Sequence, residues 1–172
     1  MAESPKIMVP TIDLVAATPD QEPVLANLLE LYIHEFTEWV DLDVGPDGRF
    51  GYSQLPLYWI EQNRHPFLLE AGGKLAGFVL VQRAPCVFGS EAVWDVAEFF
   101  VLRRYRRGGI GTEAAHRVWK RFAGRWQIRV REKNHSALRF WANAIAGFCG
   151  QAVSPARIEK DGQWWQVFRF DS

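Results

Sequence analysis

Cysteine is scarce in this 172-residue sequence, and Cys86 and Cys149 do not form a C-x-x-C pair. This argues against a disulfide framework, so we expect free thiols in a reducing compartment. The four histidines have no metal-ligand spacing, and we expect no metal ion. No basic segment followed by an apolar run opens the sequence, and no apolar run reaches the roughly 18 residues of a membrane span. We therefore expect a cytoplasmic protein without a membrane anchor.

Apolar residues are plentiful instead. They make up 48% of the sequence, against 23% charged residues, which is the balance of a globular protein with a sizeable core. We expect one domain over residues 1–172, with an irregular lead over residues 1–10.

Charge is balanced overall but unevenly distributed along the chain. Residues 1–101 contain 5 Lys/Arg and 15 Asp/Glu, whereas residues 102–139 contain 12 and 2. This asymmetry indicates either two binding surfaces of opposite sign or two solvated faces that partly cancel in the fold.

Hydrophobic periodicity predicts alternating groups of strands and helices. In chain order they are a strand at 11–15, helices at 18–36 and 57–63, strands at 66–71, 74–83 and 92–102, a helix from 110 to about 124, a strand at 126–131, a helix from 134 to about 147, and strands at about 149–153 and 164–170. Gly72-Gly73 predicts a two-residue hairpin between two of these strands. The order predicts an α/β (α+β) protein with a mixed, mostly antiparallel sheet of about seven strands and helices on both faces.

The segment "RRYRRGGIGTEAA", residues 103–115, has four arginines, then three glycines, then a predicted helix. Glycines let the backbone approach a ligand, and the first amides of a helix have no partner within it. A phosphate or pyrophosphate is the ligand that such a site favours. A tight turn that needs glycine only for its backbone angles is the alternative.

Two nucleotide motifs can be compared with this segment. A Walker A loop is excluded because no lysine follows Gly111. Gly109-x-Gly111-x-x-Ala114, with Glu132 about 20 residues further on, fits a dinucleotide fingerprint and leaves an NADP-type reductase open. Two features argue against the dinucleotide fingerprint. It normally opens a long series of βαβ units, but only 61 residues follow Gly111. The strands before the glycines are predicted to be antiparallel and joined by a two-residue hairpin, which a parallel sheet would not use.

Another pattern fits the segment and its surroundings better. Arg106-x-x-Gly109-x-Gly111 after the strand "AEFFVL" resembles motif A of the GCN5-related N-acetyltransferases (GNAT), Gln/Arg-x-x-Gly-x-Gly/Ala at a helix start. "NHSALRFWANAIAGF" at 134–148 resembles motif B of that family, with one extra residue before the final Gly-Phe. The element order is similar over nearly the whole chain. The sequence most resembles a group of predicted acetyltransferases of unsettled substrate.

The resemblance implies acetyl-CoA as co-substrate, with its pyrophosphate in the arginine–glycine loop and its pantetheine arm along the preceding strand. It also implies that a backbone N–H around Val101 and Leu102 polarises the thioester carbonyl, and that Asn134 contacts the arm. The cofactor-binding residues implied in this way are Val101, Leu102, Arg106, Arg107, Gly108, Gly109, Ile110, Gly111, Thr112, Asn134 and Trp141.

The sequence departs from the family pattern in two places. Trp141 stands where many members have a tyrosine that protonates the departing thiolate, and an indole N–H is only a hydrogen-bond donor. Arg103 stands where a proline is usual. The first departure leaves an acyl-CoA-binding module without turnover open as an alternative.

Glu98 is the candidate catalytic residue. In a regular strand Trp94, Val96 and Phe100 would share its face, and such surroundings raise the pKa of a carboxyl toward the range of a general base. Its position three residues before Val101 is also near the catalytic glutamate of some family members. The alternative is a structural glutamate paired with an arginine of the basic segment, and Asp95, predicted on the other face, is the weaker candidate.

The acidic residues between positions 35 and 47 indicate the charge of the acceptor. In the family fold this region borders the acceptor site, and its carboxylates would attract a small cationic amine; they are Glu35, Glu38, Asp41, Asp43 and Asp47. A solvated helix face is the alternative. Tyr32, Tyr52 and other aromatic residues nearby are candidates for the pocket wall. We expect no nucleic-acid or membrane partner, and a homodimer stays open.

Overall fold

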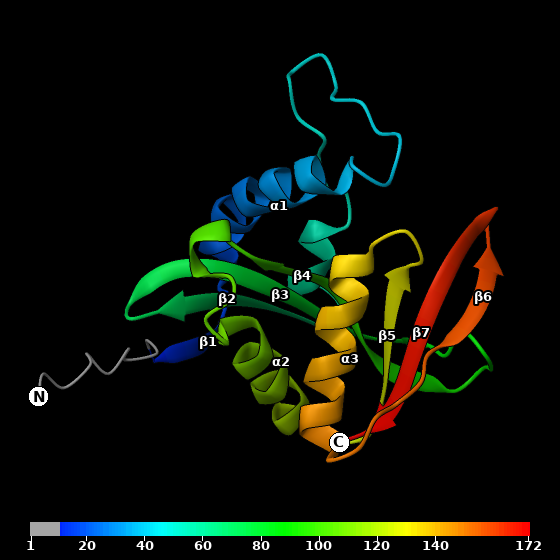
Figure 1. Cartoon of the computed structure of the whole chain (residues 1–172). Coiled ribbons are helices and arrows are strands. Elements are labelled where there is room, and N and C mark those ends of the chain that lie inside the picture. The colour runs from blue at the N-terminus through cyan, green and yellow to red at the C-terminus, as the bar shows by residue number, and fades with distance from the viewer. Residues whose placement is uncertain (1–10) are drawn as a thin grey trace, which may run out of the picture.

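The computed structural model describes residues 11–172, so the lead expected at 1–10 lies outside the described residues. The strands are β1 (Ile12–Ala16), β2 (Arg64–Ala71), β3 (Lys74–Pro85), β4 (Ala92–Val101), β5 (Arg125–Arg131), β6 (Ala156–Lys160) and β7 (Gln163–Asp171). They form one sheet in the order β1-β2-β3-β4-β5-β7-β6, as Figure 1 shows. Every neighbouring pair is antiparallel except β4 and β5, which are parallel. The predicted mixed, mostly antiparallel sheet is confirmed.

Helices cover both faces of this sheet, as predicted. The helices are α1 (Glu22–Phe36), α2 (Ile110–Arg121) and α3 (His135–Cys149). Leu25 of α1 packs in one buried cluster with Phe78 of β3, whereas Val118 of α2 and Ile145 of α3 pack in another with Ile128 of β5. Figure 1 shows α2 and α3 side by side on the face away from α1. Within residues 11–172, no helix has the length and apolar character to cross a membrane.

The hairpin between β2 and β3 turns at Gly72-Gly73, as expected. Both glycines have positive φ, 56° and 71°, which is the left-handed pair that a tight hairpin turn requires. This hairpin holds the antiparallel half of the sheet against α1.

Two short elements differ from the sequence prediction. The expected helix at 57–63 is a 3₁₀ turn at Leu55–Trp59. The expected strand at 149–153 is wrong, because α3 continues to Cys149 and ends on Gly150, whose φ of 71° makes it the left-handed cap. The strand that follows is β6, which begins only at Ala156. The helix continues through Gly147, because a glycine inside a helix is tolerated at modest cost.

β4 contains a bulge in the middle of the strand. Leu80 of β3 pairs with Glu98, but the next residue, Val81, pairs with Val96, so Ala97 has no partner in the ladder. One extra residue reverses the alternation of faces and bends the strand. The bulge therefore changes which side chains share a face beyond it.

The bulge overturns part of the sequence prediction. Trp94 and Val96 pack in the cluster under α2 and α3, whereas Phe100, as expected, packs on the α1 side with Glu98. Asp95, predicted on the opposite face from Glu98, lies on the same one, close enough for its charge to act on the Glu98 carboxyl. Strict alternation fails here because it assumes a regular strand.

β4 and β5 diverge soon after they meet. Their ladder consists of the pairs Trp94–Trp126 and Asp95–Gln127. Beyond these pairs, the bent end of β4 leaves a gap toward β5. The site lies where the two strands separate.

Candidate functional site

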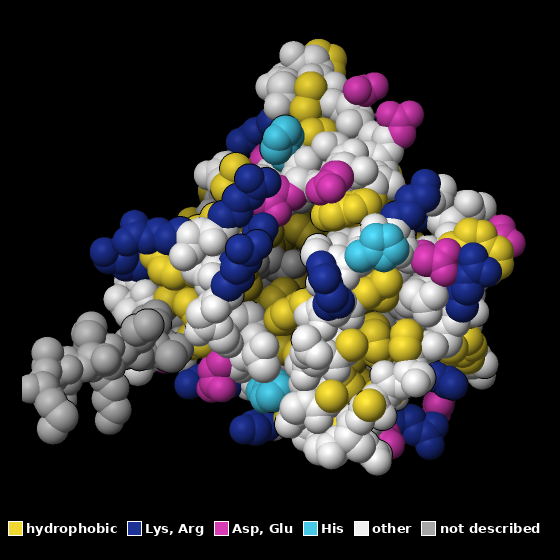
Figure 2. Space-filling view, viewed as in Figure 1, with side chains coloured by type: hydrophobic (Ala, Val, Ile, Leu, Met, Phe, Trp, Pro, Cys, Tyr) yellow, Lys and Arg dark blue, Asp and Glu magenta, His cyan; other side chains and the backbone are white. Residues whose placement is uncertain are grey.

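A cleft of about 830 Å³ opens between the diverging ends of β4 and β5. Figure 2 shows hydrophobic side chains in a hollow of this face and Lys and Arg side chains around it. The predicted residues that line the cleft are Glu98, Val101, Arg106, Arg107, Gly109, Gly111, Thr112, Asn134 and Trp141. Leu102, Gly108 and Ile110 do not line it, and the Ile110 side chain is buried in the core.

The loop before α2 presents unpaired amides to this cleft. The first hydrogen bond of the helix runs from Glu113 N to Gly109 O at 3.0 Å, so the N–H groups of Ile110, Gly111 and Thr112 lie ahead of the helical ladder. Gly109 has a φ of 81°, and Arg107 has a left-handed φ of 65°. Unpaired amides at the positive end of a helix dipole have the chemistry that suits an anion.

The glycines of this loop serve different purposes. A Cβ on Gly111 would lie 3.0 Å from Phe140 Cε2, so this glycine allows α2 and α3 to pack closely. A Cβ on Gly109 would meet no described atom within 4 Å, so that position needs glycine for its backbone angle.

Arg106 is anchored within the protein. Its Nε donates to the carbonyl of Val101 at 2.7 Å and its Nη2 to Glu35 at 2.8 Å, while Arg103 donates to the other Glu35 oxygen at 2.9 Å. Arg106 therefore ties the end of β4 to α1. Since two arginines occupy Glu35, this carboxylate is not available to attract an amine, contrary to one expectation from the sequence.

Glu98 is half-buried in the cleft, with protein atoms around most of its carboxyl. The Tyr52 hydroxyl donates to its Oε1 at 3.1 Å. Burial raises the pKa of Glu98 above its ordinary value, while hydrogen bonds from Tyr32 and Tyr52 and the charge of Arg129 oppose this shift in part. A carboxylate with a raised pKa has the property that a general base near neutral pH requires.

The tyrosines around Glu98 are donors. Burial and the neighbouring Glu98 raise the pKa of Tyr52 and of Tyr32 far above the ordinary value, so both hydroxyls keep their protons. The sequence predicted both tyrosines as candidates for the pocket wall, but their contact with Glu98 could be recognised only in the structure. Among the described residues Glu98 forms no ion pair with an arginine within 4.0 Å, so the pairing expected for a structural glutamate is not seen.

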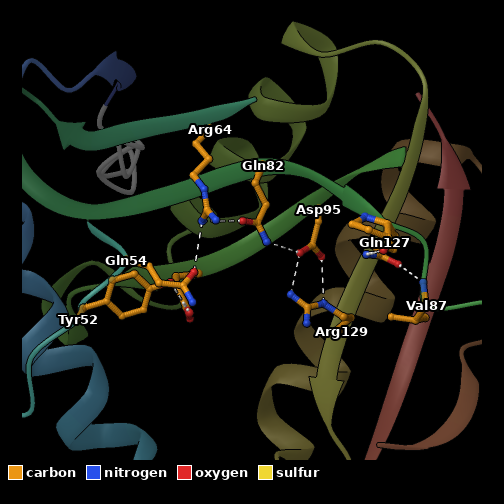
Figure 3. Close-up of polar contacts among 10 residues, drawn as sticks. Tyr52, Gln54, Arg64, Gln82, Val87, Asp95, Gln127 and Arg129 are labelled. Carbon is orange, nitrogen blue, oxygen red and sulfur yellow. Dashed lines mark hydrogen bonds and ion pairs between the residues drawn. The ribbon is translucent and has the colours of Figure 1, made fainter. Parts of the chain in front are cut away.

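Asp95 is fully buried and fully occupied. Arg129 of β5 donates to its Oδ1 at 3.2 Å and its Oδ2 at 2.7 Å, and Gln82 of β3 donates to Oδ2 at 3.1 Å. The chain of contacts continues from Gln82 to Arg64 and Gln54 (Figure 3). Asp95 therefore fixes Arg129 beside the cleft.

The backbone of β4 offers donors along the open edge. The N–H of Leu102 donates to Ala76 O at 2.8 Å, so Leu102 cannot polarise a carbonyl, contrary to the expectation. Because N–H groups alternate along an antiparallel ladder, those of Phe99 and Val101 point away from β3 and toward the gap. Val101 is the remaining donor of the predicted pair.

Asn134 and Trp141 belong to α3. The Oδ1 of Asn134 accepts from Ala137 N at 3.0 Å, so this side chain caps the start of the helix. Trp141 is largely buried, with its ring centroid 5.0 Å from Phe99 and 4.8 Å from Phe140. The tryptophan thus lines the cleft on one side and packs against the hydrophobic core on the other.

The residues of the dinucleotide fingerprint do not assemble a nucleotide site. Glu132, the acid it requires, accepts two hydrogen bonds from Arg157 and one from Gln166. The strand before the glycines, β4, is antiparallel to β3, which a doubly wound nucleotide fold does not allow.

Comparison with known proteins agrees with this geometry. The family model described as "Acetyltransferase (GNAT) family" matches residues 25–148. A comparison with curated proteins gives no match.

Several solved structures share the fold. An acetyltransferase from Thermus thermophilus is 17% identical, with a TM-score of 0.68 over 95% of this chain and 99% of that one. YncA from Salmonella typhimurium, solved with its cofactor acetyl-CoA, is 11% identical, with a TM-score of 0.62 over 93% of each chain. The ribosomal-protein-S18-alanine N-acetyltransferase from Escherichia coli is 13% identical, with a TM-score of 0.60 over 94% of each chain. At these identities the likeness establishes the fold.

Proposed function

Since this chain belongs to the acetyltransferase (GNAT) family, we propose that it moves the acetyl group of acetyl-CoA to the primary amine of a small molecule by direct attack in a ternary complex. The observation that carries the proposal is the raised pKa of Glu98 in a cleft that also receives the free amides of α2. An amine reaches the cleft as a cation at neutral pH, and Glu98 is the group that takes up its proton.

The co-substrate fits the residues that line the cleft. The amides of Ile110, Gly111 and Thr112 suit a pyrophosphate, with Arg107 beside them. The open edge of β4 offers Phe99 and Val101 to an extended amide-containing arm, as another strand would. With Oδ1 used in the cap, the Nδ2 of Asn134 is the side of that amide that donates to the arm.

Residues of the cleft have a distinct role in each step of the proposed transfer. Glu98 first takes one proton from the ammonium ion and releases it to solvent. The neutral nitrogen then attacks the thioester carbonyl carbon, the C–S bond breaks with CoA leaving as the thiolate, and the second nitrogen proton passes to Glu98. The N–H of Val101 donates to the carbonyl oxygen while negative charge develops on it. Tyr52 and Tyr32 hold the Glu98 carboxylate in position.

Trp141 provides no proton for the leaving group. A thiol has a pKa of about 8.5, so CoA can depart as the thiolate near neutral pH. We therefore propose that Trp141 contacts the co-substrate as a wall of the cleft and that protonation of sulfur follows in solvent.

Calorimetry with acetyl-CoA and with NADPH tests the binding half of this proposal. We expect binding of acetyl-CoA and none of NADPH. The reverse result would overturn the acetyltransferase proposal in favour of a reductase. A screen of amines for CoA release then separates an enzyme from a binding module, since a module binds acetyl-CoA without releasing CoA for any amine.

The variant Glu98→Gln tests the catalytic half. Gln has nearly the same shape but cannot accept the proton, so kcat at neutral pH should fall by roughly 100-fold or more, the range typical of general-base removal. The affinity for acetyl-CoA, measured by calorimetry, should stay unchanged. An unchanged kcat would remove Glu98 as the base.

A further inference from the structure

A second, smaller pocket adjoins the cleft on the other side of β5. Its volume is about 210 Å³. It is lined by Val87, Arg129, Arg131, Ile158, Lys160, Asp161, Gln163 and Trp165. Arg129, Arg131 and Trp165 line the cleft as well, so the two hollows share a wall.

The small pocket lies on the face of the sheet that Glu98 occupies. Ile128 and Val130 of β5 point into the core under α2 and α3. By alternation, Arg129 and Arg131 point to the opposite face. Arg129 donates to Asp95 (Figure 3). Asp95 lies on the same face as Glu98, close enough for its charge to act on the Glu98 carboxyl.

Arg131 is the unusual residue in this pocket. Its guanidinium lies 4.1 Å from the centroid of the Trp165 ring, and its Nε and Nη1 are buried without a hydrogen bond to any atom of residues 11–172. Burial lowers the pKa of Arg131, but an arginine stays charged at any physiological pH. The third nitrogen, Nη2, is not among these buried atoms and forms no hydrogen bond or ion pair within residues 11–172, so it is the part of the guanidinium that an anion in the pocket can reach.

The neighbouring charges leave that position to a ligand. Arg129 is matched by Asp95 at 2.7 Å. Lys160 is exposed at the pocket, and in the described part of the chain neither Lys160 nor Asp161 forms an ion pair within 4.0 Å. With Arg129 neutralised, Arg131 and Lys160 outnumber Asp161, so the pocket is net positive.

We propose that this pocket binds an anionic group of the acceptor, a carboxylate or a phosphate, which Arg131 receives through its Nη2 and Lys160 attracts. The acceptor is then an amine that carries a negative charge at its other end. Trp165 holds the guanidinium flat and excludes water from one side of it. This inference rests on the proposed acetyl transfer and adds the substrate class to it.

Matched pairs of acceptors test the substrate class. An amino acid is compared with its neutral amide, and an aminoalkyl phosphate with the corresponding amino alcohol, by the release of CoA from acetyl-CoA. We expect kcat/KM to be roughly 10- to 100-fold higher for one or both anionic members, the range for a hydrogen bond to a charged group. A preference in the first pair identifies a carboxylate, and one in the second a phosphate. Equal rates within both pairs overturn the inference while leaving acetyl transfer intact.

The variant Arg131→Gln tests the residue. It should raise KM for the anionic acceptor by a similar factor, erase the preference within the pair, and leave KM for acetyl-CoA unchanged. A rise in KM for acetyl-CoA instead would assign Arg131 to the co-substrate and overturn the inference. Lys160→Gln, at an exposed position that the fold does not need, should weaken the same preference to a smaller degree, which guards against a folding defect in the first variant.

Arg169→Gln is the matched control. Arg169 is exposed on β7, packs on Phe88 and lines neither hollow, so its loss removes one positive charge from the same sheet. It should leave both KM values unchanged. If it lowers the preference as much as Arg131→Gln does, net charge rather than the pocket explains the effect, and the inference fails. Acetyl-CoA binding, measured first, distinguishes this failure from a failure of the proposed function.

Discussion

Glu98 is a carboxyl group in aromatic surroundings that, within residues 11–172, lacks the cationic partner such a buried group ordinarily has. Tyrosine hydroxyls donate to it instead. Asp95, three positions earlier on the same face, has the opposite arrangement, with Arg129 on both of its oxygens. The two environments separate a group poised to accept a proton from one that only positions an arginine.

The stability of Glu98→Gln relative to the native protein should rise with pH. The raised pKa means that folding favours protonated Glu98. The stability this group contributes is therefore complete below its ordinary pKa of about 4.3 and is lost as pH rises through the higher folded pKa. Gln does not titrate over this pH range. The free energy of unfolding of Glu98→Gln relative to that of the native protein should therefore increase with pH by about 1.4 kcal/mol for each unit of pKa shift.

Urea unfolding of both proteins at about pH 4 and about pH 8 measures this effect. The quantity compared is the difference between their free energies of unfolding. A difference that stays constant with pH would mean that the pKa of Glu98 is not raised in the fold.

Among the elements, the loop before α2 concentrates the positions where backbone geometry decides function. Arg106 closes the loop onto β4 and α1 through Val101 and Glu35. Gly109 turns the chain so that the amides of α2 face the cleft. The arginines are therefore not equivalent, since Arg106 has a structural partner on each side and Arg107 lines the cleft.

Gly109→Val should abolish acetyl-CoA binding. Its side chain would project where no described atom lies within 4 Å, into space beside the free amides, and the left-handed φ would add about 1–2 kcal/mol of strain. Calorimetry with acetyl-CoA measures the loss.

Gly150→Val is the control for strain. Gly150 has a similar φ of 71° and equally open surroundings, but it caps the far end of α3. The two variants should lose comparable stability, and only Gly109→Val should lose binding. Normal affinity in Gly109→Val would show that the loop does not hold the pyrophosphate.

Hydrophobic periodicity and turn chemistry were sufficient to predict the helices and most strands. Gly72-Gly73 predicted its hairpin, and residues of the two family motifs, more than 20 positions apart in the sequence, line the same cleft. The bulge at Ala97 could not be predicted, because one unpaired residue leaves no mark in an apolar strand. For the same reason the neighbours predicted for Glu98 were partly wrong.

Across the whole molecule, the separated charges of the sequence come together. The acidic first half supplies Glu35, Glu91 and Asp95, and the basic middle supplies the arginines that pair with them. These pairs link α1 to the loop before α2 and β4 to β5. Arg107, which lines the cleft, and Arg131 form no ion pair within 4.0 Å among residues 11–172, and there a ligand rather than a carboxylate of the chain is the expected partner.

The divergence of β4 and β5 should be visible in the exchange of backbone hydrogens with solvent. Leu102 donates to β3, and alternation assigns the same role to Phe100, whereas the N–H groups of Phe99 and Val101 face the gap. In the free protein we expect fast exchange at Phe99 and Val101 and slow exchange at Phe100 and Leu102. Addition of acetyl-CoA should slow exchange at the first two alone, a protection that falls on alternate residues because the bound arm completes the sheet as a strand.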